Sequence, residues 1–357
     1  MTASTSALPE TDYPSRWSAW TMTALERLPV PYAWVVTAWA VAAAIAQVLE
    51  YSLRDPGFLQ AGADFRGGLL FVALNVYILI YLRILKRQAV RDLAALRPAV
   101  QVGDAVYDRQ VHRTLGANRL VEALILLISA ALWSAIILGL SSNELLAPAR
   151  ARPGGILILA YVLLGYVLLS WLALTLIYTT IRYARGLGAV AHFPLSVNVF
   201  DPMNLLPFGR LSLLYSVAPV GLVLIPLIGL GRPTQMAGFL IIGFAVVSLL
   251  LLFVPLWGVH HQMVQARGDV LQNIHERLME VQSALLKQPD IDAAGIKLLT
   301  DRTTIMVNLR KLIVDAPSWP FKSEAAVVRA IIATTSPLIY FALNQFLLTL
   351  ISPLLKR

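Results

Sequence analysis

Runs of apolar residues dominate the pattern along this chain, and six of them are long enough to cross a membrane as helices. A crossing helix needs about 20 predominantly apolar residues, because the hydrocarbon core of a bilayer is roughly 30 Å thick. The six predicted spans are residues 30–48, 67–82, 120–140, 155–180, 211–230 and 236–259. The pattern therefore predicts an all-α polytopic integral membrane protein.

The last apolar run, residues 325–355, predicts either a seventh, C-terminal membrane helix or a re-entrant one. Near its middle, Thr334, Pro337, Phe341, Asn344 and Gln345 are spaced by 3, 4, 3 and 1 positions and share one helical stripe. Pro337 permits a broken helix that enters and returns, which is tolerated only where protein or a water cavity covers the freed backbone. We favour a full crossing, in which the stripe either packs against neighbouring helices or faces water.

The apolar spacing between residues 260 and 315 predicts a cytosolic antiparallel helical hairpin. Apolar residues are spaced by three and four positions in the first helix and by seven in the second. Pro289 interrupts the pattern, and Asp290 is suited to cap the second helix. Two helices packed on each other explain the pattern, and a hairpin that also builds an oligomer interface is the alternative. The residues concerned are Val264, Leu271, Ile274, Leu278, Val281 and Leu285, then Leu299, Met306 and Ile313.

These segments divide the chain into four regions. Residues 1–29 form a cytosolic leader with an interfacial helix, whose Trp17 and Trp20 suit the headgroup level. Residues 30–259 form the six-helix transmembrane domain, with a basic cytoplasmic loop at 83–119 and an interfacial elbow at 191–210. The hairpin occupies residues 260–315, and residues 316–357 hold a Trp-Pro-Phe linker and the C-terminal membrane helix.

Prolines mark the candidates for gating or coupling. Asp201 followed by Pro202 is typical of a helix start, with Asp as the cap and Pro at the first position. Pro219 and Pro226 predict a kinked fifth span, and Pro337 offers a break in the last helix. We interpret the elbow as an interfacial connection, and a coupling element between the hairpin and the membrane helices is the alternative.

Composition and charge agree with a membrane protein. Hydrophobic residues make up 58% of the chain and charged residues 14%, against roughly a half and a quarter in soluble domains. Lys and Arg gather in residues 83–119, 182–210 and from 267 onward, which the positive-inside rule places in the cytoplasm. The N-terminus is then cytoplasmic, in a multi-pass protein of the plasma (inner) membrane. Its +9 net charge suits anionic headgroups of the inner leaflet rather than nucleic acid.

Candidate chemistry is sparse. The chain has no P-loop, HExxH or GxSxG motif, so we expect neither an enzyme nor a cofactor. Zero cysteines exclude disulfides and thiolate nucleophiles. His260 and His261 diverge by about 100° on a helix and so do not easily share a metal ion. Glu122 is the only carboxylate close to a span interior, and with Arg119 it is predicted to form an interfacial pair.

Three functions fit this sequence. The first is a homo-oligomeric ion channel or pore lined by Thr334, Asn344 and Gln345, since pores select with neutral polar groups as well as with charges. The alternative is a non-transporting scaffold or sensor subunit that binds a cytosolic protein partner through the hairpin. The third is a secondary transporter, which the near absence of titratable groups in the predicted spans disfavours.

Overall fold

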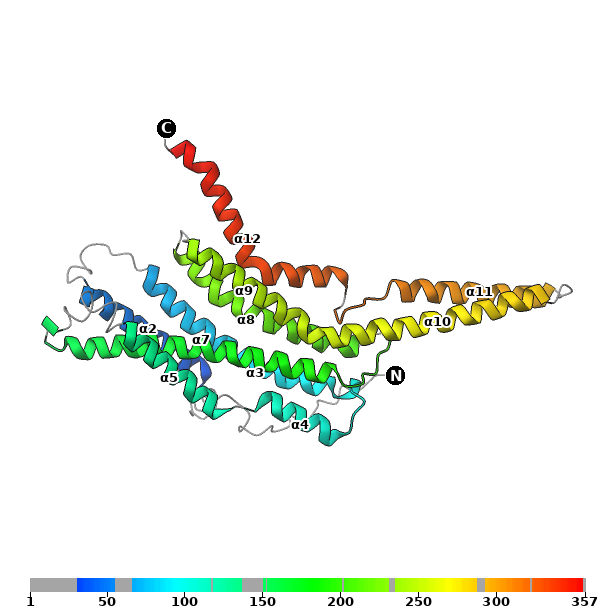
Figure 1. Ribbon diagram of the computed structural model, residues 1–357, viewed down its shortest axis with the longest axis horizontal. Helices are drawn as coiled ribbons and strands as arrows, with labels where there is room; N and C mark the ends of the chain where they lie inside the picture. The colour runs from blue at the N-terminus through cyan, green and yellow to red at the C-terminus, as the bar shows by residue number, and fades with distance from the viewer. Residues whose placement is uncertain are drawn as a thin grey trace. The chain divides into compact units, whose positions relative to one another are not determined.

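The computed structural model is mainly helical in the residues that it describes. These are residues 31–54, 66–116, 118–136, 150–151, 153–200, 202–230, 235–287, 293–321 and 323–355. An isolated β-bridge between Val100 and Leu195 is the only extended pairing among them. The helices shown in Figure 1 are α2 (Tyr32–Arg54), α3 (Arg66–Leu96), α4 (Asp104–Leu115), α5 (Arg119–Ala135), α7 (Gly155–Ala191), α8 (Leu206–Leu230), α9 (Gln235–Phe253), α10 (Trp257–Lys287), α11 (Ala293–Val314) and α12 (Glu324–Leu355).

Seven helical segments within the described ranges are long and apolar enough to cross a membrane. They are Tyr32–Ser52, Gly68–Ala99, Asp104–Ala135, Gly155–Ala191, Met203–Leu227, Ile241–Ser283 and Ala325–Phe346. Each contains all or most of one predicted span, the C-terminal one included, so the predicted all-α polytopic membrane protein is confirmed. The leader at residues 1–29 lies outside the described residues.

The chain forms two compact units. Unit 1 comprises Met1–Arg87, His112–Thr180 and Leu224–Arg232, and unit 2 comprises Gln88–Val111, Ile181–Val223 and Pro233–Arg357. Unit 1 therefore contains α2, α5 and most of α3 and α7. Unit 2 contains α9 to α12, most of α4 and the first part of α8. The predicted four-region division stays a prediction.

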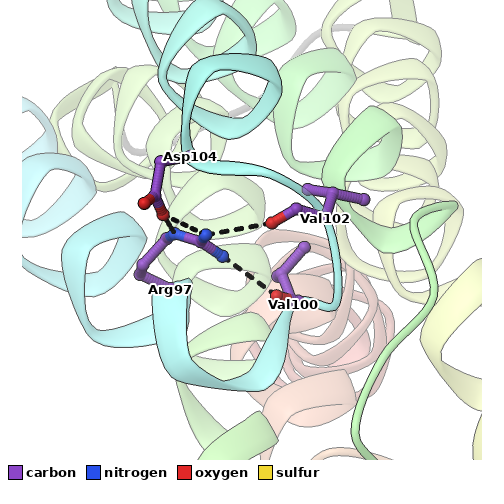
Figure 2. A network of polar contacts seen from close by, with 4 residues as sticks. All are labelled: Arg97, Val100, Val102 and Asp104. Carbon is purple, nitrogen blue, oxygen red and sulfur yellow. Dashed lines mark hydrogen bonds and ion pairs between the residues drawn. The ribbon is translucent and has the colours of Figure 1, made fainter.

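The region predicted as a basic loop, residues 83–119, is largely helical. Helix α3 continues to Leu96, the 3₁₀ turn η2 (Arg97–Ala99) follows, and α4 begins at Asp104. Figure 2 shows how Arg97 closes the turn: its guanidinium contacts Asp104 and donates to the carbonyls of Val100 (3.0 Å) and Val102 (2.9 Å). Lys, Arg, Gln, Ala and Leu favour helices, so the charges mark the end of the apolar run and not the end of α3.

Helices α10 and α11 form the predicted hairpin and lie side by side in Figure 1. Ile274 and Ile313 are buried in the seam between them. Helix α10 follows α9 directly through the 3₁₀ turn η6 (Val254–Leu256). The other predicted seam residues are half-buried where their exposure is described, except Val264, which is exposed: Leu271, Leu278, Val281, Leu299 and Met306.

Helix α12 is continuous across Pro337, packs along α9 and is bent in Figure 1. A proline inside a helix removes one backbone hydrogen bond and bends the axis. The re-entrant alternative requires a broken helix, and α12 has no break within its described residues. The close packing depends on Gly238 of α9, where an added Cβ would lie 3.1 Å from the ring of Phe341.

Candidate functional site

The C-terminal part of α2 carries two buried polar side chains, Gln47 and Glu50, which are only 6% and 5% exposed. They share a helix face with Ala43 and Ala46, which are also buried, because residues three or four positions apart are neighbours on a helix. Glu50 lies within Tyr32–Ser52, a segment able to cross a membrane. A carboxylate is therefore enclosed by protein inside a candidate membrane span.

Two of the partners of Glu50 are neutral hydrogen-bond donors. The hydroxyl of Tyr166, on α7, donates to Glu50 Oε2 at 2.7 Å, and Gln47 Nε2 donates to the same oxygen at 3.2 Å. Gln47 Nε2 also lies 3.5 Å from the Tyr166 oxygen, so the three side chains form a closed cluster. Hydrogen bonds to a carboxylate stabilise its charged form, and a phenol oxygen is able to accept a hydrogen bond as well as to donate one.

Two aromatic rings hold Tyr166 in place. Trp133 of α5 stacks on it with ring centroids 4.5 Å apart, and Phe71 of α3 meets it edge-on at 5.2 Å. Both arrangements are favoured by the quadrupoles of aromatic rings. Helices α2, α3, α5 and α7 thus all contribute to the environment of one phenol, and its hydroxyl is directed at Glu50.

A cavity of about 170 Å³ reaches Ala46, one helical turn from Glu50, although none of the three cluster residues lines it, and its wall includes a polar link. The indole N–H of Trp39 donates to Asn75 Oδ1, and Asn75 Nδ2 donates to the carbonyl of Phe71, both at 2.9 Å. Apart from this link the wall is mostly apolar. The wall consists of Trp39, Ala42, Ala43, Ala46, Phe71, Asn75, Tyr161, Leu164, Gly165 and Leu168.

Glu122 is a second buried carboxylate of unit 1, only 3% exposed. It lies in the first turn of α5, whose N-cap Asn118 accepts a hydrogen bond from the backbone N–H of Leu120 at 3.1 Å. Glu122 lines a cavity of about 280 Å³ together with Arg119 and Trp171. Trp171 follows Tyr166 by five positions on α7, about 7.5 Å along the axis, so both buried carboxylates adjoin the same helix.

The two adjacent histidines have different environments, as their expected divergence on a helix implies. His260 stacks on Trp319 with centroids 4.1 Å apart, and its Nδ1 lies 2.7 Å from the carbonyl oxygen of Ser318. His261 is exposed. Among the described residues, no three His, Cys, Asp or Glu side chains are grouped so as to hold a metal ion. The Trp-Pro-Phe linker is thus anchored on the start of α10.

The elbow, residues 191–210, is bound to α10 by a residue that sequence reasoning missed. Gln262 Nε2 donates to the carbonyls of Ala191 and Phe193, and its Oε1 accepts from the N–H of Leu195, all at 2.9 Å. Pro202 begins the 3₁₀ turn η5 (Pro202–Leu205), which leads into α8. Asp201, its predicted cap, lies outside the described residues.

The remaining candidates lie on two helices. Pro219 and Pro226 are both inside α8, and their part in gating stays a prediction. On α12, Thr334 is fully buried and its hydroxyl donates to the carbonyl of Ala330 at 2.9 Å. Asn344 is half-buried and Gln345 is exposed. A pore lining by the three polar residues also stays a prediction, and the burial of Thr334 favours the packing alternative.

The fold and the site define an α-helical polytopic membrane protein that encloses carboxylates in its candidate spans. Comparison with protein-family models, curated proteins and solved structures finds no match. Function is therefore inferred from the residues of this chain alone.

Proposed function

We propose that the protein is a proton-coupled secondary transporter of the plasma (inner) membrane, with its N-terminus in the cytoplasm. The observation that carries this proposal is the burial of Glu50 in a candidate span, with Tyr166 and Gln47 as its hydrogen-bond donors. Ionisable side chains inside a membrane are unfavourable and are typical of proton relays and substrate pathways. The sequence favoured a channel over a transporter because the predicted spans hold almost no such groups.

A proton fits the Glu50 cluster better than a metal cation does. Hard divalent cations take about six or more oxygen ligands, whereas the contacts described for this cluster bring together one carboxylate and one phenol oxygen. A proton needs only the carboxylate. The binding of a proton removes the negative charge of Glu50 and makes Glu50 the hydrogen-bond donor to Tyr166. It therefore changes how α2 is held to α7.

Glu122 supplies the second protonation site of the proposal. In the predicted orientation, Glu50 lies toward the outer end of its span and Glu122 toward the inner end of its own. Both adjoin α7, near Tyr166 and Trp171, and both border or neighbour a cavity. We propose that protons exchange at these two carboxylates as the cavities open in turn to the two sides.

Transport assays on reconstituted protein test this proposal. Proteoliposomes loaded with a pH-sensitive dye receive the small-molecule fraction of a cell extract, and proton movement is followed. We expect Glu50→Gln to slow the movement by about a hundredfold, the scale of losing a positioned proton-transfer group. Glu280→Gln, on the exposed surface of α10, is the matched control. Equal rates of proton movement for the wild type and Glu50→Gln would contradict the proposal.

The homo-oligomeric ion channel is the second candidate, and the exposed part of α12 favours it. Gln345 lies there beside Leu343 and Phe346, which are exposed as well, so copies of this helix have a surface with which to meet. Because the chain has no cysteine, Asn344→Cys tests it with a membrane-impermeant thiol reagent. Labelling supports an aqueous path along α12. A protein that neither transports nor labels, and that co-purifies with a cytosolic partner, is instead the scaffold or sensor.

A further inference from the structure

Helix α11 presents a row of exposed apolar residues that the hairpin does not use. Leu298, Ile305 and Leu312 are 54%, 59% and 61% exposed. The seam with α10 takes the neighbouring row, in which Met306 is half-buried and Ile313 is fully buried. The two rows are offset by one residue, about 100° around the helix, so α11 has a second apolar face.

The spacing of the exposed row indicates the kind of partner. Residues seven positions apart lie nearly in line on a helix, and such a line suits the seam with another helix that crosses at about 20°. Asp301 and Asn308 interrupt the row along the helix. The other large apolar residues exposed on the described part of α11, Val307 and Val314, lie about 200° away around it. An interfacial helix instead has a broad apolar face with Lys and Arg beside it, and an acidic residue such as Asp301 is repelled by anionic headgroups. The row therefore suits a helix better than a membrane surface.

The groove beside the row carries both signs of charge. It lies between α10, α11 and Phe200 of the elbow, has a volume of about 840 Å³, and includes Ile305 of the row. Asp269, Arg277 and Arg302 also line it, with an apolar floor that includes Ile274. A two-fold pair brings the same patch of each copy together, so the patch must be complementary to itself. Acidic and basic residues on one patch meet this requirement, because the Asp of one copy is able to face the Arg of the other.

We propose that this face of α11 is the docking surface for a second copy of the chain, which pairs through Leu298, Ile305 and Leu312. The pairing does not depend on Glu50 or on the transport proposal, so the two fail separately. It assigns the expected homo-oligomer to a defined surface on the hairpin and leaves the α10–α11 seam intact.

Disulfide trapping in native membranes tests the pairing, because the chain has no cysteine of its own. We expect Ile305→Cys to give a covalent dimer of twice the chain mass on mild oxidation. Thr304→Cys, one residue away and also exposed but outside the row, is the matched control and should stay monomeric. Leu298→Cys and Leu312→Cys show whether the two α11 helices run parallel or antiparallel. In a parallel pair, each variant forms a disulfide dimer with its own kind. In an antiparallel pair, a disulfide forms only between a Leu298→Cys copy and a Leu312→Cys copy.

Two results would overturn the pairing. One is an Ile305→Cys protein that stays monomeric on oxidation and reacts with a soluble thiol reagent as fast as Thr304→Cys. The other is a cross-linked product whose mass identifies a different protein or a lipid adduct.

A charge substitution gives an independent readout in detergent. We expect Ile305→Asp to raise the dimer dissociation constant by at least about tenfold, measured by light scattering. Val307→Asp places the same charge at a 52% exposed position about 200° away on α11 and should leave the constant unchanged. Equal constants for both variants, or a wild-type monomer at every concentration, would contradict the proposal. If Ile305→Asp loses helix content by circular dichroism, the disulfide result decides.

Discussion

A carboxylate inside a membrane helix has to be held by partners from elsewhere in the chain, and Glu50 has such a partner in Tyr166. The two residues are 116 positions apart in sequence, and the hydroxyl-to-carboxylate distance is 2.7 Å. Trp133 and Phe71 fix the phenol ring, so the donor keeps its direction. The Tyr166 hydroxyl is therefore preorganised toward Glu50.

Tyr166→Phe removes the hydroxyl and keeps the ring. We expect it to destabilise the protein by about 1.5–3 kcal/mol, the usual worth of a hydrogen bond to a charged group, and to slow proton movement. Thermal unfolding in detergent and the proteoliposome assay measure the two effects. Tyr340→Phe on α12 removes an exposed phenol hydroxyl that lines neither cavity and is the control for transport. If both variants transport equally, the phenol of Tyr166 has no part in the mechanism.

Gly209 is the residue at which a side chain fits least. A Cβ placed there would lie 2.1 Å from the carbonyl oxygen of Pro320, so Gly209→Ala must displace the Trp-Pro-Phe linker. We expect a loss of about 1–3 kcal/mol, as for overpacked sites. Gly243→Ala, on α9 with open space around it, should be neutral or slightly stabilising. Equal unfolding temperatures for the two variants would show that the linker is not packed there.

The sequence did not identify Glu50 as a site residue, because the first predicted span ends at residue 48, where the apolar run gives way to polar residues. Their position on the helix could have identified Gln47 and Glu50 as buried, because they continue the helix face of Ala43 and Ala46. Polar residues at an exposed helix end would not be expected to keep to that face. The partner Tyr166 carried no comparable signal. One tyrosine among many apolar residues of a long span does not reveal which helix it meets.

At the scale of elements, hydropathy located the helices and misjudged where they end. The bilayer demands apolar length, so all seven candidate spans were predictable. The continuation of α3 to Leu96 was not, because charge marks the membrane boundary while helix propensity continues beyond it. The hairpin seam was predictable from its heptads, whereas the elbow's attachment to α10 depends on the single side chain of Gln262.

Gln262→Leu tests that attachment. It leaves two carbonyls and one N–H of the elbow without their partner, so we expect faster amide hydrogen exchange at Leu195 and its neighbours. Gln272→Leu, an exposed residue further along α10 that bonds to Glu276, should leave elbow exchange unchanged. Unchanged exchange in Gln262→Leu would mean that the backbone bonds from Ser196 to Ala99 and from Gln101 to Pro194 hold the elbow by themselves.

At the scale of the whole molecule, the distribution of Lys and Arg predicts the orientation. It places the hairpin in the cytoplasm and the connection between the third and fourth spans outside. In intact cells, an impermeant thiol reagent should label Ser142→Cys in that connection and should label Thr304→Cys on α11 only after permeabilisation. Labelling of Thr304→Cys in intact cells would reverse the orientation, and with it the assignment of Glu50 to the outer side.

The central claim is that Glu50 gains and loses a proton within the membrane, and infrared difference spectroscopy of the reconstituted protein tests it most directly. The account predicts a carboxylic acid C=O band that accompanies proton uptake during transport, shifts in Tyr166→Phe and is absent from Glu50→Gln. A spectrum in which Glu50→Gln retains every carboxyl band of the wild type would contradict it, and Glu50 would then be a fixed structural contact between α2 and α7.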